Sequence, residues 1–204
     1  STSRIEQLCL AHTYGSGGDE SCENTVRAVE NLLFGQTVDH YAALSMDAVP
    51  LLADLVGGVP VTIDTDMTAV DPRLIEGETV TLEGELALSY VRARQIVSDG
   101  TNQSRMARQE QFLRAAWEAW MEKTASGDAV ELGTDALVSL GERLRSDCTV
   151  QKLSRFLERT EQCELTVLPA PAGEAKISEE NIAEFYVDDD ALEQTVLELF
   201  YREE

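Results

Sequence analysis

The sequence predicts an α/β protein in which a mixed central sheet is sandwiched by helices, an α/β/α arrangement. Two observations lead to this prediction. Segments with helical spacing of apolar residues alternate with short apolar runs typical of strands through the first sixty residues. Further helices and short strands then follow to the end of the chain. With 204 residues, 43% of them apolar, the chain suits one domain spanning residues 1–204 around one core.

The first half of the chain alternates helices and strands between turn signals. The predicted elements are a helix from the loop 15–18 to Gly35, a strand at 38–44, a helix at 47–55, a strand at 59–63 and a helix at 83–90. Asp19 or Ser21 is the expected N-cap of the first helix, because either side chain can accept hydrogen bonds from free amide groups. Pro60 indicates either that it lies at the start of the second strand or that this strand is at the edge of the sheet. Residues 64–83 are predicted to be turns.

The second half is predicted to be mainly helical. The expected elements are a loop at 95–103, a helix at 105–123, a linker at 124–133, helices at 134–145 and 148–160, strands at 164–168 and 184–187, a turn at 169–174 and a final helix at 190–201. We expect residues 121–204 to complete the domain that the first half begins.

The net charge is −22, from 38 acidic and 16 basic residues. Such a surface repels phosphate backbones, so nucleic acid is not an expected partner.

The four cysteines form two pairs that are local in sequence, and they are Cys9 with Cys22 and Cys148 with Cys163. Two disulfides would suit an oxidising compartment. Four thiols that behave as small apolar side chains are an equally good interpretation.

Five of the sixteen basic residues fall within residues 92–114. In an extended segment, Arg92 and Arg94 project to the same side because side chains alternate. Four side chains share one face of the helix that follows, and they are Arg105, Arg108, Gln109 and Phe112. If the intervening loop brings the arginine pair over this face, the guanidiniums can bind phosphate, since each donates two parallel hydrogen bonds. The alternative is an ordinary solvated face.

This stretch resembles the signature of the LytR-CpsA-Psr family, in which Arg-x-Arg precedes an Asp-Gly loop and an Arg-x-x-Arg-Gln helix. Other elements recur in the family's order, and they are Ala11-His-Thr-Tyr-Gly15, Asp39-His-Tyr41, Met46-Asp47, Gly57-Gly58-Val59, Leu82-x-Gly84, Ala87-Leu88 and Tyr90-Val91-Arg92. The core of the resemblance covers about residues 7–120. Each element is weak alone, and their common order is specific.

The resemblance implies a phosphotransferase that attaches a polyprenyl-pyrophosphate-linked anionic glycopolymer, of the teichoic acid or capsular polysaccharide type, to peptidoglycan with the help of Mg²⁺. By position, Arg92 and Arg94 match the family's pyrophosphate-binding arginines and are the expected catalytic residues, with Asp99 in support. The expected substrate-binding residues are completed by Arg105, Arg108, Gln109 and His12. A structural role for the His12 ring is equally plausible.

A hydrophobic tunnel for the prenyl chain is also implied by the resemblance. The leucines that could line it are Leu32, Leu33, Leu51, Leu52 and Leu55, although such residues more often form an ordinary core. The elements that carry the family's metal-binding aspartates precede the matched region, so we expect the Mg²⁺ ligands and a membrane anchor outside this sequence. The implied location is the extracytoplasmic cell surface.

Three hypotheses for function follow. The first is the transferase, and the second is a non-catalytic module of the cell envelope that holds a polyprenyl-phosphate lipid. The absence of the amino-terminal carboxylates favours the second. The third, a transcription regulator, is disfavoured by the acidic charge and by the lack of a basic helix-turn-helix pattern.

Overall fold

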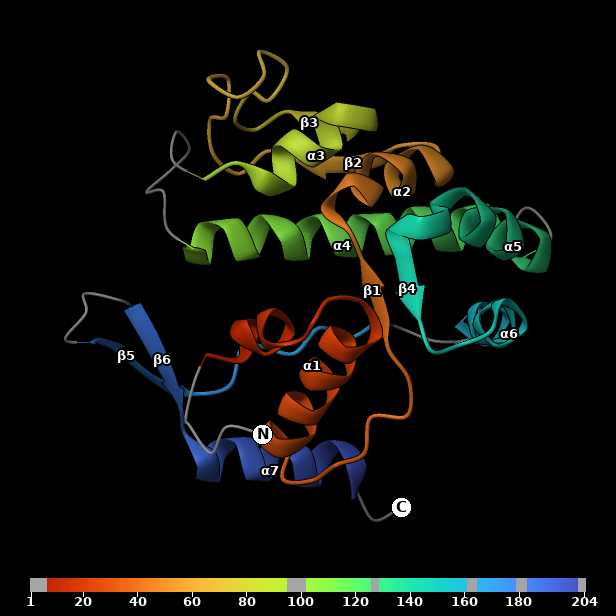
Figure 1. Ribbon diagram of the computed structural model, residues 1–204. Helices are drawn as coiled ribbons and strands as arrows, with labels where there is room; N and C mark the ends of the chain where they lie inside the picture. Colours follow the sequence, from red (N-terminus) through yellow and green to blue (C-terminus); the bar gives the residue numbers. More distant parts are fainter. Residues whose placement is uncertain (1–6, 95–101, 126–128, 161–164, 179–182, 202–204) are drawn as a thin grey trace. The chain divides into compact units, whose positions relative to one another are not determined.

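The structure is a computed structural model, and it describes residues 7–94, 102–125, 129–160, 165–178 and 183–201 (Figure 1). The chain divides into two compact units, one formed by residues 1–41 with 166–204 and the other by residues 42–165. Helices and short strands occur in both, which confirms the α/β class. The prediction of one domain over residues 1–204 stays a prediction.

The unit of residues 42–165 contains most of the helices. Its elements are β1 (Ala42–Leu44), the 3₁₀ helix η2 (Met46–Ala48), α2 (Val49–Leu55), β2 (Val59–Thr62), β3 (Thr79–Leu82), α3 (Gly84–Arg92), α4 (Asn102–Ala125), α5 (Ala129–Leu140), η3 (Gly141–Arg143), β4 (Leu144–Ser146) and α6 (Val150–Thr160).

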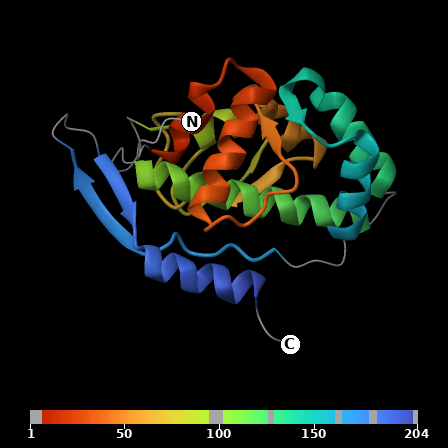
Figure 2. The ribbon, with the colours of Figure 1, turned by 60° about the horizontal axis from the view of Figure 1, so that its bottom comes forward.

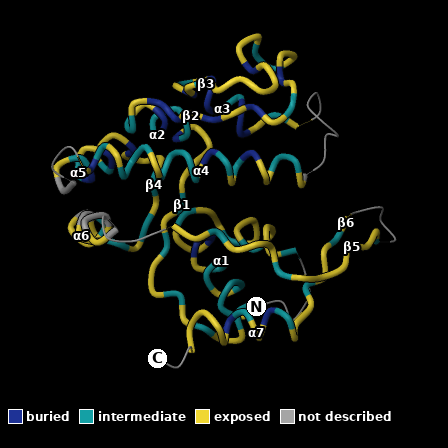
Figure 3. The backbone as a smooth tube through the Cα atoms, turned by 180° about the vertical axis from the view of Figure 1, so that it is seen from behind, coloured by how far each residue is buried: buried dark blue, intermediate teal, exposed yellow. Residues whose placement is uncertain are grey.

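The core of this unit lies where β2, α2, α3 and α4 meet (Figure 3). Val59 and Val61 of β2 are buried while Pro60 and Thr62 are exposed, the alternation expected of a strand with one covered face. The helix α3 buries four side chains against this core, and they are Leu86, Ala87, Tyr90 and Val91. From α4, Phe112 completes the cluster at 3% exposure. The core therefore packs directly beneath the end of α3, where Arg92 lies.

Two close contacts join the end of α2 and the turn after it to the segment from β3 to the start of α3. The side chain of Asp54 in α2 accepts a hydrogen bond from the Gly84 amide at 2.8 Å, which satisfies a free N–H at the start of α3. Gly58 adopts φ +96°, and a Cβ atom there would lie 2.3 Å from Cγ2 of Thr81 in β3. A glycine is needed at this position for both reasons.

The described strands pair as three separate two-stranded antiparallel sheets, β1 with β4, β2 with β3 and β5 with β6. The expected single mixed sheet is not seen among the described residues. Strand character can be recognised from local composition, but the partner of a strand depends on distant residues. The strand β3 was not predicted because it lies in the polar, turn-rich stretch 64–83. The helix predicted at 134–145 is wrong in its position, since α5 spans Ala129–Leu140 and so begins within the predicted linker at 124–133, and β4 occupies Leu144–Ser146.

The other unit combines the two ends of the chain (Figure 2). Its elements are the 3₁₀ helix η1 (Leu8–Tyr14), α1 (Gly18–Leu32), β5 (Gly173–Ile177), β6 (Ala183–Val187) and α7 (Asp189–Phe200). Side chains join segments that are far apart in sequence: Gln7 donates to the Ala183 carbonyl at 3.4 Å, and the Tyr201 hydroxyl donates to Gln36 at 3.2 Å. Asp188 is the N-cap of α7 and accepts from the Ala191 amide at 3.1 Å.

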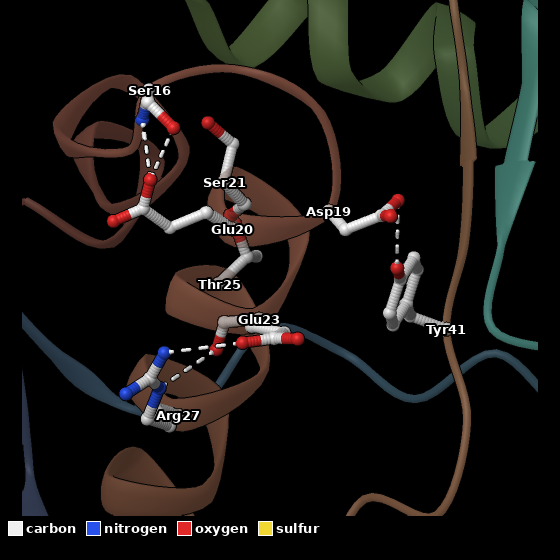
Figure 4. Close-up of polar contacts among 8 residues, drawn as sticks. All are labelled: Ser16, Asp19, Glu20, Ser21, Glu23, Thr25, Arg27 and Tyr41. Atoms are coloured by element: carbon white, nitrogen blue, oxygen red, sulfur yellow. Dashed lines mark hydrogen bonds and ion pairs between the residues drawn. The ribbon is translucent and has the colours of Figure 1, made fainter.

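The start of α1 differs from the prediction (Figure 4). Gly17, at φ +91°, is the N-cap, so Asp19 and Ser21 lie inside the helix. The Ser21 hydroxyl still accepts from the Gly17 amide at 3.2 Å. The carboxylate of Glu20 accepts from the side chain and the amide of Ser16, and these hydrogen bonds lower its pKa. Side chains from the first helical turn therefore bond back to the loop.

The strand predicted at 164–168 and the turn at 169–174 are wrong for the described residues. Residues 165–172 have no regular structure, and β5 begins at Gly173. Pro169 and Pro171 lack amide hydrogens, which disfavours strand pairing in this segment.

The cysteines are free where the structure describes them. Cys9 is exposed and Cys22 is buried, and no disulfide joins them. Cys148 is free as well, and Cys163 lies outside the described residues. For the first pair the structure favours the thiol interpretation over the disulfide.

Candidate functional site

Arg92 and Arg94 line one open pocket of about 380 Å³ on the unit of residues 42–165. Both side chains are exposed. The other described lining residues come from α3 and from the loop between β2 and β3, and they are Val70, Glu85, Leu88, Ser89 and Ala93. The pocket therefore combines two guanidiniums, one carboxylate, one hydroxyl and apolar walls.

The end of α3 determines where the two arginines project. Arg92 is the last residue of the helix, and Ala93 leaves it with φ −52° and ψ 133°. The predicted extended segment thus begins one residue later than expected, because Arg92 is helical. The change of backbone direction still places Arg92 and Arg94 on the same pocket.

Two side chains of α4 hold this segment in place. The Arg108 guanidinium donates a hydrogen bond to the carbonyl of Ala93, and Nε2 of Gln109 donates to the carbonyl of Val91 at 3.3 Å. Arg108 is only 9% exposed. These bonds satisfy carbonyls at the end of α3 that have no partner within the helix. They therefore fix the backbone on both sides of Arg92.

A chain of hydrogen bonds from the buried Tyr90 supports the same helix pair. The Tyr90 hydroxyl donates to Oε1 of Gln111, whose Nε2 donates to the Thr62 carbonyl at 2.8 Å. Burial, with a smaller effect of the Asp64 carboxylate, raises the pKa of Tyr90 to about 12, although the Arg108 charge opposes this. Tyr90 is therefore a neutral structural group at physiological pH.

The pocket offers little to a divalent cation. Among the described lining residues Glu85 is the only carboxylate, and the two guanidiniums repel positive charge. Mg²⁺ prefers several oxygen ligands in near-octahedral geometry. The described donor set therefore fits an anion, and it does not fit a metal ion held by the protein alone.

The comparisons with known proteins decide the family. The model of the LytR-CpsA-Psr family (LytR_cpsA_psr) matches residues 3–199, almost the whole chain. The chain belongs to the LytR-CpsA-Psr family. This match extends well beyond residues 7–120, which contain the short sequence elements typical of the family.

Named relatives agree with this membership. The chain is 26% identical over 154 residues to the Bacillus mycoides polyisoprenyl-teichoic acid–peptidoglycan teichoic acid transferase TagU, covering 76% of this chain and 47% of TagU. It is 38% identical over 99 residues to the Corynebacterium glutamicum cell wall biosynthesis protein LcpA, covering 47% of this chain and 18% of LcpA. The chain thus spans about half of the first relative and less than a fifth of the second.

The fold is that of solved LytR-CpsA-Psr proteins. Against the crystal structure of Bacillus subtilis TagT the TM-score is 0.71 at 19% identity, and the match covers 97% of this chain and 72% of TagT. At this identity the likeness concerns the fold.

The other predicted LytR-CpsA-Psr site residues lie in different places. Arg105 is half-buried on α4, one turn before Arg108. His12 is exposed in η1 of the other unit. Asp99 lies outside the described residues. The roles predicted for these residues stay predictions.

Glu85 and Ser89 were missed as pocket residues. With Arg92 they occupy positions i, i+4 and i+7 of α3, which is one helix face. This spacing could have identified them, since the helix itself was predicted. Val70 has no comparable signal, because its position depends on the path of the loop.

The leucines of the predicted lipid tunnel line neither of the two pockets described for this unit. Leu51, Leu52 and Leu55 are half-buried, as are Leu32 and Leu33 in the other unit. A second pocket of about 450 Å³ lies between the β2–β3 sheet and α4, and its lining includes Pro60, Thr81 and Lys123 but none of these leucines. The tunnel stays a prediction.

Proposed function

We propose that this chain carries the pyrophosphate-binding part of a transferase that moves a polyprenyl-pyrophosphate-linked glycopolymer onto peptidoglycan. The observation that carries the proposal is the pair Arg92 and Arg94, both exposed and lining one pocket at the end of α3. Membership of the LytR-CpsA-Psr family supports it, and so does the similarity to the teichoic acid transferase TagU of Bacillus mycoides.

The chemistry requires positive charge at this point. A hydroxyl of the wall acceptor attacks the phosphorus that bears the polymer, a new P–O bond forms, and the P–O bond to the lipid phosphate breaks. The hydroxyl proton passes to solvent, and polyprenyl phosphate leaves. Negative charge grows on the leaving phosphate during this step. Guanidiniums stabilise such charge with less reorganisation when their backbone is held in place, and hydrogen bonds from Arg108 and Gln109 hold the backbone that carries Arg92 and Arg94.

The other parts of the proposal rest on the family. The polyprenyl link, the peptidoglycan acceptor, a location at the cell surface and a membrane anchor are all inferred from family membership. Among the described residues, no helix combines the length and the apolar character that a membrane crossing needs. Mg²⁺ dependence is part of the same proposal, with ligands outside the described pocket.

A second candidate function is a module that binds the lipid pyrophosphate without transferring the polymer. The specific observation in its favour is the single carboxylate, Glu85, among the described lining residues. Such a pocket can hold the head group while supplying no metal site.

Transfer to peptidoglycan tests the proposal. The chain is incubated with a radiolabelled lipid-linked glycopolymer, peptidoglycan and Mg²⁺, and polymer that resists detergent extraction is counted. We expect the wild type to bind the labelled lipid, Arg92→Ala/Arg94→Ala to lose this binding and Arg114→Ala to keep it, since Arg114 pairs with Glu110 on the exposed face of α4. Transfer by the wild type would show that the chain supplies the rest of the catalytic site as well. Lipid binding without transfer would favour the binding module, and absence of both would contradict either function.

A further inference from the structure

The helix α6 has an exposed face that combines three cations with one aromatic ring. Lys152, Arg155, Phe156 and Arg159 occupy positions i, i+3, i+4 and i+7, which lie on one side of a helix. All four residues are exposed, and Phe156 is 61% exposed. Leu153 is half-buried, and α6 packs against α5. We call these four residues the α6 basic face.

This face contrasts with the rest of the molecule. The chain has a net charge of −22, yet the basic face carries three cations. The helix α7 provides an internal comparison, because it also exposes an aromatic ring, Phe200, at 52%. The sequence of α7 contains four acidic residues and no Lys or Arg. An exposed phenylalanine surrounded by cations is therefore specific to α6 among these two helices.

We propose that the α6 basic face docks this chain onto an anionic lipid surface. Helices that lie in a membrane interface combine basic residues with bulky apolar ones, which enter the boundary between head groups and acyl chains. Long Lys and Arg side chains extend their charges towards the head groups while their stems stay on apolar surface. Phe156 supplies the apolar anchor, and the three cations supply the attraction to anionic head groups.

The acidic remainder of the chain does not prevent such contact. At physiological ionic strength charges are screened over about 8 Å, so a lipid surface at α6 interacts mainly with the charges of that helix. The remaining acidic surface would be repelled, which favours an orientation with α6 towards the lipid. Local charge complementarity thus selects one face for docking.

An anionic polymer is the main alternative binding partner of this face, and the role of Phe156 distinguishes a polymer from a lipid surface. A polyanion would contact the three cations and gain little from an apolar ring. Insertion into lipid depends on the ring as well as on the cations. The lipid proposal therefore predicts that two kinds of variant fail, those that lose charge and those that lose the ring.

Vesicle co-sedimentation of the full chain tests the proposal. The probes are vesicles of phosphatidylcholine alone and of phosphatidylcholine with about 30 mol% phosphatidylglycerol. We expect the wild type to bind only the anionic vesicles and to be released at about 1 M salt, where the Debye length is about 3 Å. Lys152→Gln/Arg155→Gln/Arg159→Gln should lower partitioning by about a hundredfold, since each cation contributes about fivefold. Phe156→Ser should lower it by roughly tenfold or more.

Two controls make the result specific. Phe200→Ser removes a ring of similar exposure from an acidic helix and should leave vesicle binding unchanged. Arg114→Gln removes a cation that pairs with Glu110 on α4 and should also leave it unchanged. The vesicles contain no pyrophosphate lipid, so failure of the docking proposal can be told apart from failure of the proposed function. Circular dichroism confirms that each variant is folded. A wild type that ignores anionic vesicles, or binding that survives Phe156→Ser, would overturn the proposal.

Discussion

Arg108 and Gln109 show how a side chain near a site can serve it through the backbone. Both were predicted to contact the substrate. Their hydrogen bonds in the structure go to the carbonyls of Ala93 and Val91, on either side of Arg92. The sequence predicted that Arg108, Gln109 and Phe112 share a face of α4, and their burial is consistent with one inward face. It could not predict that this face meets the end of α3, because that contact depends on tertiary packing.

Replacing Arg108 should therefore cost stability. Arg108→Ala removes a hydrogen bond made by a buried charged group and should lower the free energy of unfolding by about 1.5–3 kcal/mol. Arg114→Ala on the same helix breaks an exposed i,i+4 ion pair at 3.0 Å and should cost about 0.3–0.5 kcal/mol. Urea unfolding measures both. Equal losses in the two variants would show that the Arg108 hydrogen bond to Ala93 stabilises the fold no more than an exposed ion pair does.

Tyr90 should make stability depend on alkaline pH. Its pKa is raised to about 12 in the folded chain, above the value of about 10 expected when unfolded. The folded state thus holds this proton more tightly than the unfolded state. Its contribution to the free energy of unfolding is therefore fully present below about pH 10 and is lost as the pH rises towards 12. In urea unfolding over this range, Tyr90→Phe should show a shallower decline than the wild type. Parallel declines would mean that Tyr90 ionises as freely in the folded chain as in the unfolded one.

At the scale of elements, local sequence signals were sufficient for most helices and for β2. Apolar spacing predicted α1, α3, α4, α6 and α7 to within a few residues, since apolar residues recur at helical spacing in each segment. The strand β3 was missed because it lies in a polar, turn-rich stretch, and β4 because its first residues were assigned to a helix at 134–145. Both strands pair with residues that are distant in sequence. The residues of the pocket divide in the same way, into those with a local sequence signal and those placed by tertiary structure. Helical spacing could have placed Glu85 and Ser89 beside Arg92, whereas Val70 depends on a loop.

The glycine pair between α2 and β2 should respond unequally to substitution. Gly57 and Gly58 both adopt positive φ, +84° and +96°, but a Cβ atom at Gly57 meets open space while one at Gly58 meets Thr81. Gly57→Ala should cost about 1–2 kcal/mol from backbone strain alone. Gly58→Ala adds an overpacking cost of about 1–3 kcal/mol. Thermal unfolding of the two variants compares them directly, and equal midpoints would refute the close approach to Thr81.

At the scale of the whole molecule, charge is distributed unevenly. The net charge of −22 argues against a nucleic acid partner as a general expectation, and it does not indicate where the cations gather. The structure describes two such places in the unit of residues 42–165. One is the pocket of Arg92 and Arg94, and the other is the α6 basic face. Family membership was recognisable from ordered short elements, because those elements are local in sequence.

The measurement that tests the central claim most directly is calorimetric titration of a short-chain polyprenyl pyrophosphate into the chain, with and without Mg²⁺. The account predicts binding by the wild type and by Arg114→Ala. In Arg92→Ala/Arg94→Ala the affinity should fall by at least about a hundredfold, since each charge-assisted contact contributes about 1.5–3 kcal/mol. Equal affinity in the wild type and the double variant, or no binding by the folded wild type, would contradict the claim that these arginines hold the pyrophosphate.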